Sequence, residues 1–181
     1  MNHVEALELV KSKVNDDKLV KHMLAVESCM KSLAKHLGED EEKWGLAGIL
    51  HDIDYEKTKN NPEEHGLEGA IFLKEFDIPE DILNAIKVHA GHGEPETKMD
   101  MALLASDALS GLIVASALVH PGGLRGIDVD FVMRKFKEKQ FARGADREII
   151  KSQCEKMNLE LEEFVSVCLS GMQKIADVLA L

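Results

Sequence analysis

Apolar residues recur at intervals of three and four over most of the chain, and this spacing limits the fold class more than any other feature. The segment from residue 19 to 37 shows the pattern clearly, with apolar side chains at Leu19, Met23, Val26, Met30, Leu33 and Leu37. Such spacing puts apolar side chains on one face of a helix. No segment has the strict apolar–polar alternation that is typical of a strand, and no internal repeat is present. We therefore predict an all-α protein.

Capping residues and breaks divide the chain into helices. Gly38 and Asp40 predict the end of one helix and the start of the next, because glycine favours the C-cap and aspartate the N-cap. Residues 54–61 are polar and predict a loop. The segment 99–119 is apolar on most sides and is expected at the centre of the core. The expected helices are 4–14, one ending near 37, 40–51, 62–76, 79–89, 99–119, and two or three more over 130–141, 146–157 and 160–181.

Length, charge and cysteine content narrow the class of protein. A chain of 181 residues is long enough for one domain with a real core. Lys and Arg number 22 against 33 Asp and Glu, and the net charge of -11 argues against nucleic-acid polymers and membrane surfaces as partners. The three cysteines are widely spaced without a CxxC pair, which predicts buried thiols in a cytoplasmic protein. We also expect no signal peptide and no segment long and apolar enough to span a bilayer.

The adjacent pair His51-Asp52 indicates a metal site. It follows directly on the apolar stretch 44–50, so both polar side chains are expected at the edge of the core. Burying an imidazole beside a carboxylate is unfavourable unless both are satisfied. A divalent cation satisfies both, because imidazole nitrogen and carboxylate oxygen are good ligands for first-row metals.

Four further ionisable residues fall on apolar faces or at helix ends. Asp107 stands in mid-helix among leucines, where a carboxylate is an ion-pair partner, a catalytic acid or a metal ligand. His22 lies beside the apolar stripe of its helix, and a core histidine bonded to a carbonyl is the plainer interpretation for that residue alone. His65 is expected in the first turn of the 62–76 helix and His89 at the end of the 79–89 helix. Together with His51-Asp52, these residues predict a site for one or two divalent ions of Fe, Mn, Co, Ni or Zn, since helical bundles assemble such sites from several helices.

The order His22, His51-Asp52, Asp107 resembles the HD-domain superfamily of metal-dependent phosphohydrolases, over about residues 22–120. The resemblance implies a single HD-type helical domain over residues 1–181, with a metal-binding core at about 18–120 and a C-terminal helical extension at about 128–181. In the two-metal branch of the superfamily two more histidines contribute, and His65-Gly66-Leu67-Glu68-Gly69-Ala70 and Val88-His89 match their places. The implied metal ligands are His22, His51, Asp52, His65, His89 and Asp107.

The resemblance also implies a function. The core is most similar to bacterial symmetrical dinucleoside tetraphosphate hydrolases, although Tyr55 stands where those enzymes usually carry a lysine. We therefore expect a metal-dependent phosphohydrolase that uses a metal-activated hydroxide on a small phosphorylated compound, in first place a nucleotide. Two alternatives stay open: an HD-type di-iron oxygenase, and a non-catalytic metal- or ligand-binding protein.

Several polar residues near this segment could assist such chemistry. Asp54 and His92 are candidates for catalytic proton transfer, and Asp54 could equally hydrogen-bond a ligand histidine. Lys57 and Arg125 are candidate substrate contacts, with a solvated surface charge as the alternative for each. A basic run could be a solvated helix face, a substrate contact or a complement to the acidic surface of a second copy in a homodimer. That run contains Arg134, Lys135, Lys137, Lys139 and Arg143.

Overall fold

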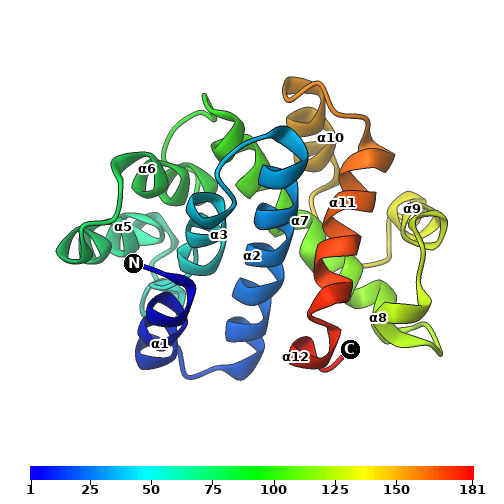
Figure 1. Cartoon of the computed structure of the whole chain (residues 1–181), viewed down its shortest axis with the longest axis horizontal. Coiled ribbons are helices and arrows are strands. Elements are labelled where there is room, and N and C mark those ends of the chain that lie inside the picture. The colour runs from blue at the N-terminus through cyan, green and yellow to red at the C-terminus, as the bar shows by residue number, and fades with distance from the viewer.

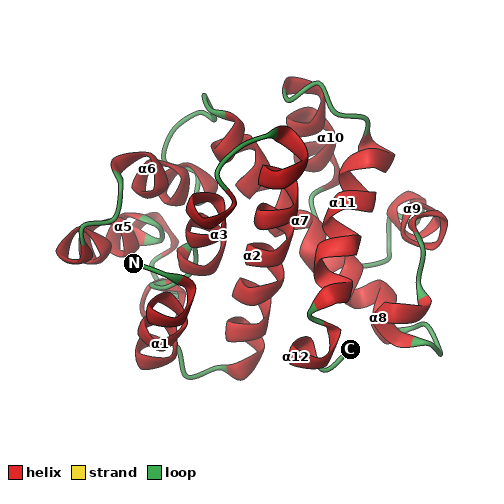
Figure 2. Ribbon diagram, in the orientation of Figure 1, coloured by secondary structure: helices red, strands yellow, loops and turns green.

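The computed structural model describes all 181 residues and contains helices and loops but no strand (Figure 2), which confirms the predicted all-α class. Two short 3-10 turns, Pro62–Glu64 and Lys74–Phe76, flank the fifth helix. The helices are α1 His3–Lys13, α2 Asp17–Leu37, α3 Glu41–Leu50, α4 Tyr55–Thr58, α5 Leu67–Leu73, α6 Glu80–His89, α7 Lys98–Leu118, α8 Gly123–Gly126, α9 Val129–Lys137, α10 Arg147–Lys156, α11 Leu161–Lys174 and α12 Ala176–Leu179.

The two longest helices, α2 and α7, form the centre of the bundle (Figure 1). α2 packs against α3 on one side and α11 on the other, and it also contacts α7. α7 contacts α6 on one side and α9 and α10 on the other. A single hydrophobic core of 48 buried residues runs from Ala6 to Leu179, so the C-terminal helices share the core of the N-terminal ones.

The predicted helix ends at residues 38 and 40 are confirmed. Gly38 is the C-cap of α2 in the left-handed conformation, with φ of 72°. The Asp40 side chain accepts a hydrogen bond from the Lys43 backbone N–H and so caps α3. These two caps turn the chain between α2 and α3, which then pack against each other along their lengths.

The prediction of one continuous helix over residues 62–76 is wrong. The 3-10 turn ends at Glu64, and α5 begins only at Leu67 after Gly66, whose φ is 75°. Only glycine fits there, because a Cβ on Gly66 would lie 2.6 Å from the Cβ of Ala90 and 2.8 Å from the Ile86 carbonyl oxygen. His65 therefore lies in a connection rather than in a first helical turn. Two smaller corrections are the single helical turn α4 within the predicted loop and a break at Ile175 between α11 and α12.

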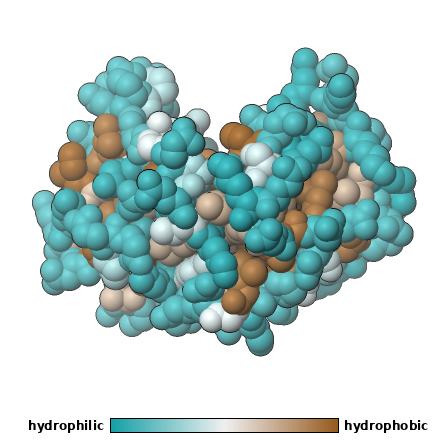
Figure 3. Space-filling view, turned by 90° about the horizontal axis from the view of Figure 1, so that it is seen from above, coloured by the Kyte–Doolittle hydropathy of each residue, from teal (hydrophilic) through white to brown (hydrophobic).

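Helix α7 corrects the expectation that no segment could span a bilayer. By length and composition alone, Lys98–Leu118 is long and apolar enough to do so. More than half of its most apolar window is buried inside the protein, however. A helix surrounded by other helices must be apolar on most sides, so its place in the core accounts for its composition. The face shown in Figure 3 is mostly hydrophilic, with smaller hydrophobic areas between.

The cysteines are free and buried, as the sequence predicted. Burial raises the pKa of the Cys154 thiol to about 12 and that of Cys168 well above its usual value. Thiols that stay protonated are poor nucleophiles and poor metal ligands, so the cysteines are packing residues.

Candidate metal centre

The corner between α3 and the following turn positions His51 and Asp52. His51 is the C-cap of α3 and is fully buried, and Asp52 is also buried. The His51 Nδ1–H donates to the Gly48 carbonyl oxygen at 2.8 Å, which turns Nε2 toward α2. Gly48 also lets α3 approach α2 closely, because a Cβ there would lie 2.7 Å from the Cα of Glu27. The absence of a side chain at Gly48 therefore brings the His51 ring near His22.

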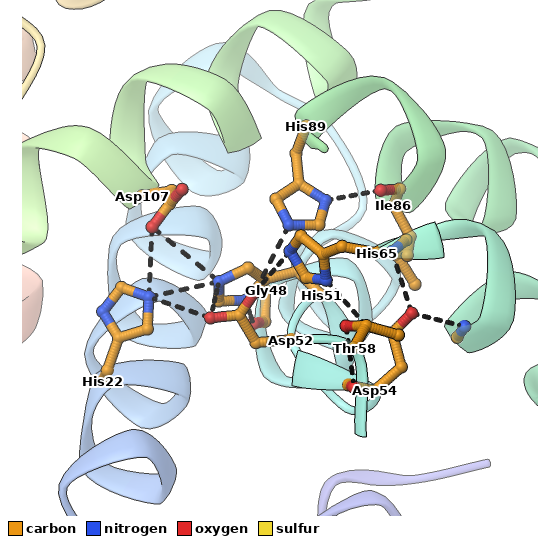
Figure 4. A network of polar contacts seen from close by, with 12 residues as sticks. His22, Gly48, His51, Asp52, Asp54, Thr58, His65, Ile86, His89 and Asp107 are labelled. Atoms are coloured by element: carbon orange, nitrogen blue, oxygen red, sulfur yellow. Dashed lines mark hydrogen bonds and ion pairs between the residues drawn. The ribbon is translucent and has the colours of Figure 1, made fainter. Parts of the chain in front are cut away.

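The first half of the site joins α2, α3 and α7 (Figure 4). His22 Nε2 lies 3.0 Å from Asp107 Oδ1 and 3.2 Å from His51 Nε2. His51 Nε2 lies 3.8 Å from the same Asp107 oxygen. The potential ligand atoms of the three residues all lie within 4.8 Å of one another, a spacing suited to one ion.

The second half of the site lies on the other side of Asp52. His65 Nε2 is 3.2 Å and His89 Nε2 is 3.4 Å from Asp52 Oδ1. His89 is the last residue of α6, and its Nδ1–H donates to the Ile86 carbonyl oxygen at 2.5 Å. The rings of His65 and His89 meet edge to face at 5.0 Å between centroids, as do those of His51 and His89.

Asp52 divides its two oxygens between these halves. While Oδ1 faces His65 and His89, Oδ2 lies 3.3 Å from His51 Nε2 and 3.6 Å from His22 Nε2. A carboxylate with one oxygen toward each set of imidazoles is the geometry of a bridging ligand. The arrangement therefore suits two ions as well as one.

The hydrogen bonds of the four imidazoles indicate that a cation belongs between them. Each ring presents Nδ1 outward: His51 and His89 to carbonyl oxygens, His65 to Asp54, and His22 to Ser110 Oγ at 3.3 Å. These acceptors favour the proton on Nδ1 and leave the Nε2 lone pairs pointing into the site. Two such lone pairs, on His22 and His51, face each other at 3.2 Å. That contact is repulsive unless a positive charge lies between them, so the donor set fits a divalent metal.

Asp54 anchors the second half from outside. Its Oδ1 accepts from His65 Nδ1 at 2.9 Å, and its Oδ2 accepts from the backbone N–H groups of Gly66 and Gly69 at 2.8 and 2.7 Å. The side chain is buried, and these donors occupy both oxygens. Of the two alternatives for Asp54, the geometry fits hydrogen bonding to a ligand histidine rather than proton transfer.

The electrostatics of the centre favour charged carboxylates and cationic rings when no metal competes. Burial by itself would lower the pKa of His51, but the Asp52 carboxylate, aided by Asp107, raises it to about 9. His65 likewise has a pKa of about 9, because Asp52 and Asp54 outweigh its burial. The pKa of Asp52 is held well below its usual value despite burial, chiefly by His51, and that of Asp107 is lowered by His22 and His51. The site thus attracts positive charge strongly.

Three other candidate residues have their polar partners outside the set of candidate metal-ligand side chains. Arg125 makes two hydrogen bonds to Asp177, of 2.9 and 2.7 Å, on the exposed side of α8. The Lys57 ammonium is paired with Glu68 and is 72% exposed. Their assignment as substrate contacts therefore gains no support, because each charge already has a carboxylate partner. The His92 ring donates from Nε2 to the His65 carbonyl oxygen at 2.9 Å, which ties it to the backbone rather than to the cluster interior.

Two residues beside the cluster were not predicted as part of it. Ser110 accepts from His22 and donates to the Asp107 carbonyl oxygen at 2.9 Å, so it joins two predicted ligands. Ser110 stands three residues after Asp107, so helical spacing puts both on the same face of α7, and this spacing could have indicated its place beside the site. Tyr55 is 45% exposed, and its ring lies edge to face with His65 at 5.4 Å between centroids. No spacing in the sequence marks that contact, because the two residues lie in different elements that only tertiary packing brings together.

Comparison with known proteins agrees with this geometry. The HD domain family model matches residues 19–120, which contain every residue of the two half-sites. The chain therefore belongs to the HD domain family, and its His/Asp cluster is consistent with the metal binding and phosphohydrolase chemistry typical of that family. No solved structure matches the chain.

Curated relatives share this part of the chain. Ribonuclease Y of Lawsonia intracellularis is 36% identical over 94 residues, which cover 51% of this chain and 18% of the relative. Ribonuclease Y of Aliarcobacter butzleri is 34% identical over 113 residues, 62% of this chain and 21% of the relative. Ribonuclease Y of Thermotoga petrophila is 29% identical over 142 residues, 72% of this chain and 27% of the relative. The similarity thus spans only about a fifth to a quarter of these longer proteins.

Proposed function

We propose that this chain is a phosphohydrolase that cleaves a phosphate ester or anhydride bond in a small phosphorylated compound, in first place a nucleotide. The reaction would take place at the His/Asp cluster, with one or two divalent transition-metal ions bound there. The observation that carries the proposal is the orientation of Asp52, whose oxygens lie 3.2–3.6 Å from two separate pairs of imidazole nitrogens. Sites that hold two ions about 3.5–4 Å apart across a shared ligand are typical of phosphoryl-transfer enzymes.

The protein's own contribution is to fix and orient the donor groups. His22, His51 and Asp107 would hold one ion, and His65 and His89 the other, with Asp52 between them. When bound, such ions supply Lewis-acid polarisation of the phosphoryl group and lower the pKa of their bound water. The hydrogen bonds from each Nδ1 prevent the rings from turning, so the Nε2 atoms need no rearrangement before metal and substrate bind.

Charge and similarity together suggest the kind of substrate. The relatives carry the name ribonuclease, which denotes cleavage of phosphodiester bonds in RNA. A net charge of -11 opposes binding of a polyanion such as RNA, because charge repulsion acts over the whole length of the polymer. A small nucleotide has the same phosphoester chemistry and meets this repulsion only locally. We therefore place a mononucleotide or short nucleotide ahead of RNA.

Metal analysis followed by a phosphate-release screen tests the proposal. Protein purified without chelator should contain one or two equivalents of Fe, Mn, Co, Ni or Zn, and it should release phosphate or a nucleoside phosphate from at least one nucleotide. Asp107→Asn should lose both metal and activity. Asp130→Asn, which changes an exposed aspartate on α9, serves as the matched control.

Two results would contradict the proposal. Uptake of dioxygen without phosphate release would indicate the di-iron oxygenase alternative. Full metal content without turnover of any phosphorylated compound would indicate a protein that binds metal or ligand without catalysis.

A further inference from the structure

A cavity of about 690 Å³ lies apart from the metal centre, where the end of α9 and the starts of α10 and α11 meet. None of the cluster residues lines it. Its apolar lining includes Met133, Phe136 and Leu161. The volume falls within the range of about 300–1,000 Å³ that is usual for small-ligand pockets.

The charge of this cavity is opposite to that of the whole chain. Five basic residues line it against two acidic ones, Asp146 and Glu148, whereas the chain carries a net charge of -11. The five basic residues are Lys137, Lys139, Arg143, Arg147 and Lys151. Clustering like charges is unfavourable unless a counter-charge is bound, so the concentration of cations here indicates an anionic ligand.

Three of these cations are available to a ligand. Lys151 forms an ion pair with Glu148 at 3.1 Å, and the Arg147 guanidinium donates its hydrogen bonds to backbone carbonyl oxygens. Lys137, Lys139 and Arg143 make no ion pair or hydrogen bond through their side chains, and all three are exposed. Three unpaired cations around one cavity exceed the charge of a single carboxylate and match a phosphate or diphosphate group.

Arg147 stabilises the connection between α9 and α10, which forms the cavity wall that carries Lys139 and Arg143. Its guanidinium donates to the carbonyl oxygens of Ala142 and Ala145 at 2.7 and 2.8 Å, and to that of Phe141 at 2.5 Å. A further bond of 3.3 Å reaches the Phe136 carbonyl oxygen in α9. One side chain thus fixes the whole connection between α9 and α10. The wall that presents Lys139 and Arg143 is therefore organised before any ligand arrives.

We propose that this cavity binds a small organic phosphate, separately from the metal centre. The phosphate groups contact Lys137, Lys139 and Arg143, and the organic part lies on the apolar lining around Phe136. The Asp146 carboxylate already accepts from the N–H groups of Glu148 and Ile149, so the start of α10 is capped by the protein itself. The side-chain cations, rather than this helix end, bind the anion. The inference is independent of the proposed reaction.

Binding of ADP to chelator-treated full-length protein tests this inference, with inorganic pyrophosphate as the probe that lacks an organic part. The double variant Lys139→Gln/Arg143→Gln should weaken ADP binding about tenfold, a loss of ~1.4 kcal/mol shared between two exposed charge contacts. Arg134→Gln removes an exposed charge on the neighbouring helix α9 outside the cavity and should change nothing. In amide NMR spectra, ADP should shift Gly144 and Ala145 and leave Gly66 and Gly69 unmoved.

Each other result counts against the inference. Pyrophosphate binding as tightly as ADP would show that the apolar lining adds nothing. Equal loss of affinity in Arg134→Gln and in the double variant would show general charge attraction. Absence of ADP binding, with a dimer that the double variant converts to a monomer, would assign the cavity to contact between two copies of the chain.

Discussion

The two halves of the metal centre are built differently. His22 and Asp107 come from the long helices α2 and α7, and His51 from the end of α3, all of which pack in the core. His65 lies in an irregular connection, and Asp54 holds its ring in place. The first half is therefore positioned by helix packing. In the second half His89 lies at the end of the packed helix α6, whereas His65 depends on a few hydrogen bonds around one buried carboxylate. Asp52 belongs to both halves, and variants can separate their contributions.

Replacing Asp52 with asparagine should have the largest effect. It removes the negative charge that faces all four imidazoles, so both halves should lose their affinity for metal together. Loss of several kcal/mol of charge stabilisation predicts a fall in hydrolysis on the order of 10³-fold or more. Metal content and phosphate release measure this. A variant that keeps two ions would refute the role of Asp52 as the shared ligand.

His22→Gln and His89→Gln should separate the two halves. Each variant removes a ligand from one half only, so each should lower metal content by about one ion if two are bound. Titration of chelator-treated protein with Mn²⁺ would count the remaining sites. Loss of both ions in His89→Gln would mean that the halves do not bind independently.

Asp54→Asn should weaken the second half and spare the first. The amide places an NH₂ group opposite donors, either the His65 Nδ1–H or the Gly66 and Gly69 N–H groups. Changes in such outer hydrogen bonds typically cost about 10- to 100-fold in metal affinity. The same Mn²⁺ titration should show one weakened site and one unchanged site. If both sites weaken equally, Asp54 supports the fold as a whole rather than His65.

Ser110→Ala is the corresponding test of the first half and should have a smaller effect. The serine hydroxyl accepts from His22 Nδ1 at 3.3 Å, a longer contact than those made by Asp54. We expect metal affinity to fall by up to about tenfold, with His22 still held by the packing of α2. Ser116→Ala, also buried on α7 but bonded only to Leu112, is the control. Equal metal affinity in the two variants would show that Ser110 has no role in positioning His22.

The metal-free protein should lose stability as pH rises, because each half of the metal centre contains a histidine with a raised pKa. His51 and His65 have pKa values of about 9 in the folded state, above the unfolded value of 6.5. Their contribution is therefore complete below about pH 6.5 and is lost as pH rises through 9, by about 1 kcal/mol or more in total. Urea unfolding at pH 6 and 9.5, with and without Mn²⁺, measures the difference. Asp54→Asn should reduce the fall, and a rise in stability over this range would contradict the charge assignment.

The sequence predicted the first half more completely than the second. Helical spacing placed His22 and Asp107 on apolar faces, and the end of an apolar run marked His51-Asp52. His65 and His89 were expected from places near helix ends, a weaker signal that the family resemblance then reinforced. The break at Gly66 was missed because it involves close contact with Ala90 and Ile86, some twenty residues away. The Arg125–Asp177 pair, 52 residues apart, was equally invisible, since only tertiary packing brings those side chains together.

The close approach of α2 and α3 at Gly48 has a consequence for ion choice. With only a hydrogen atom at this position, backbone-to-backbone contact determines the gap between the His22 and His51 rings. An alanine there would force the two helices apart and widen that gap. We therefore expect the ionic radius accepted by the centre to be decided partly at a residue that never touches the ion.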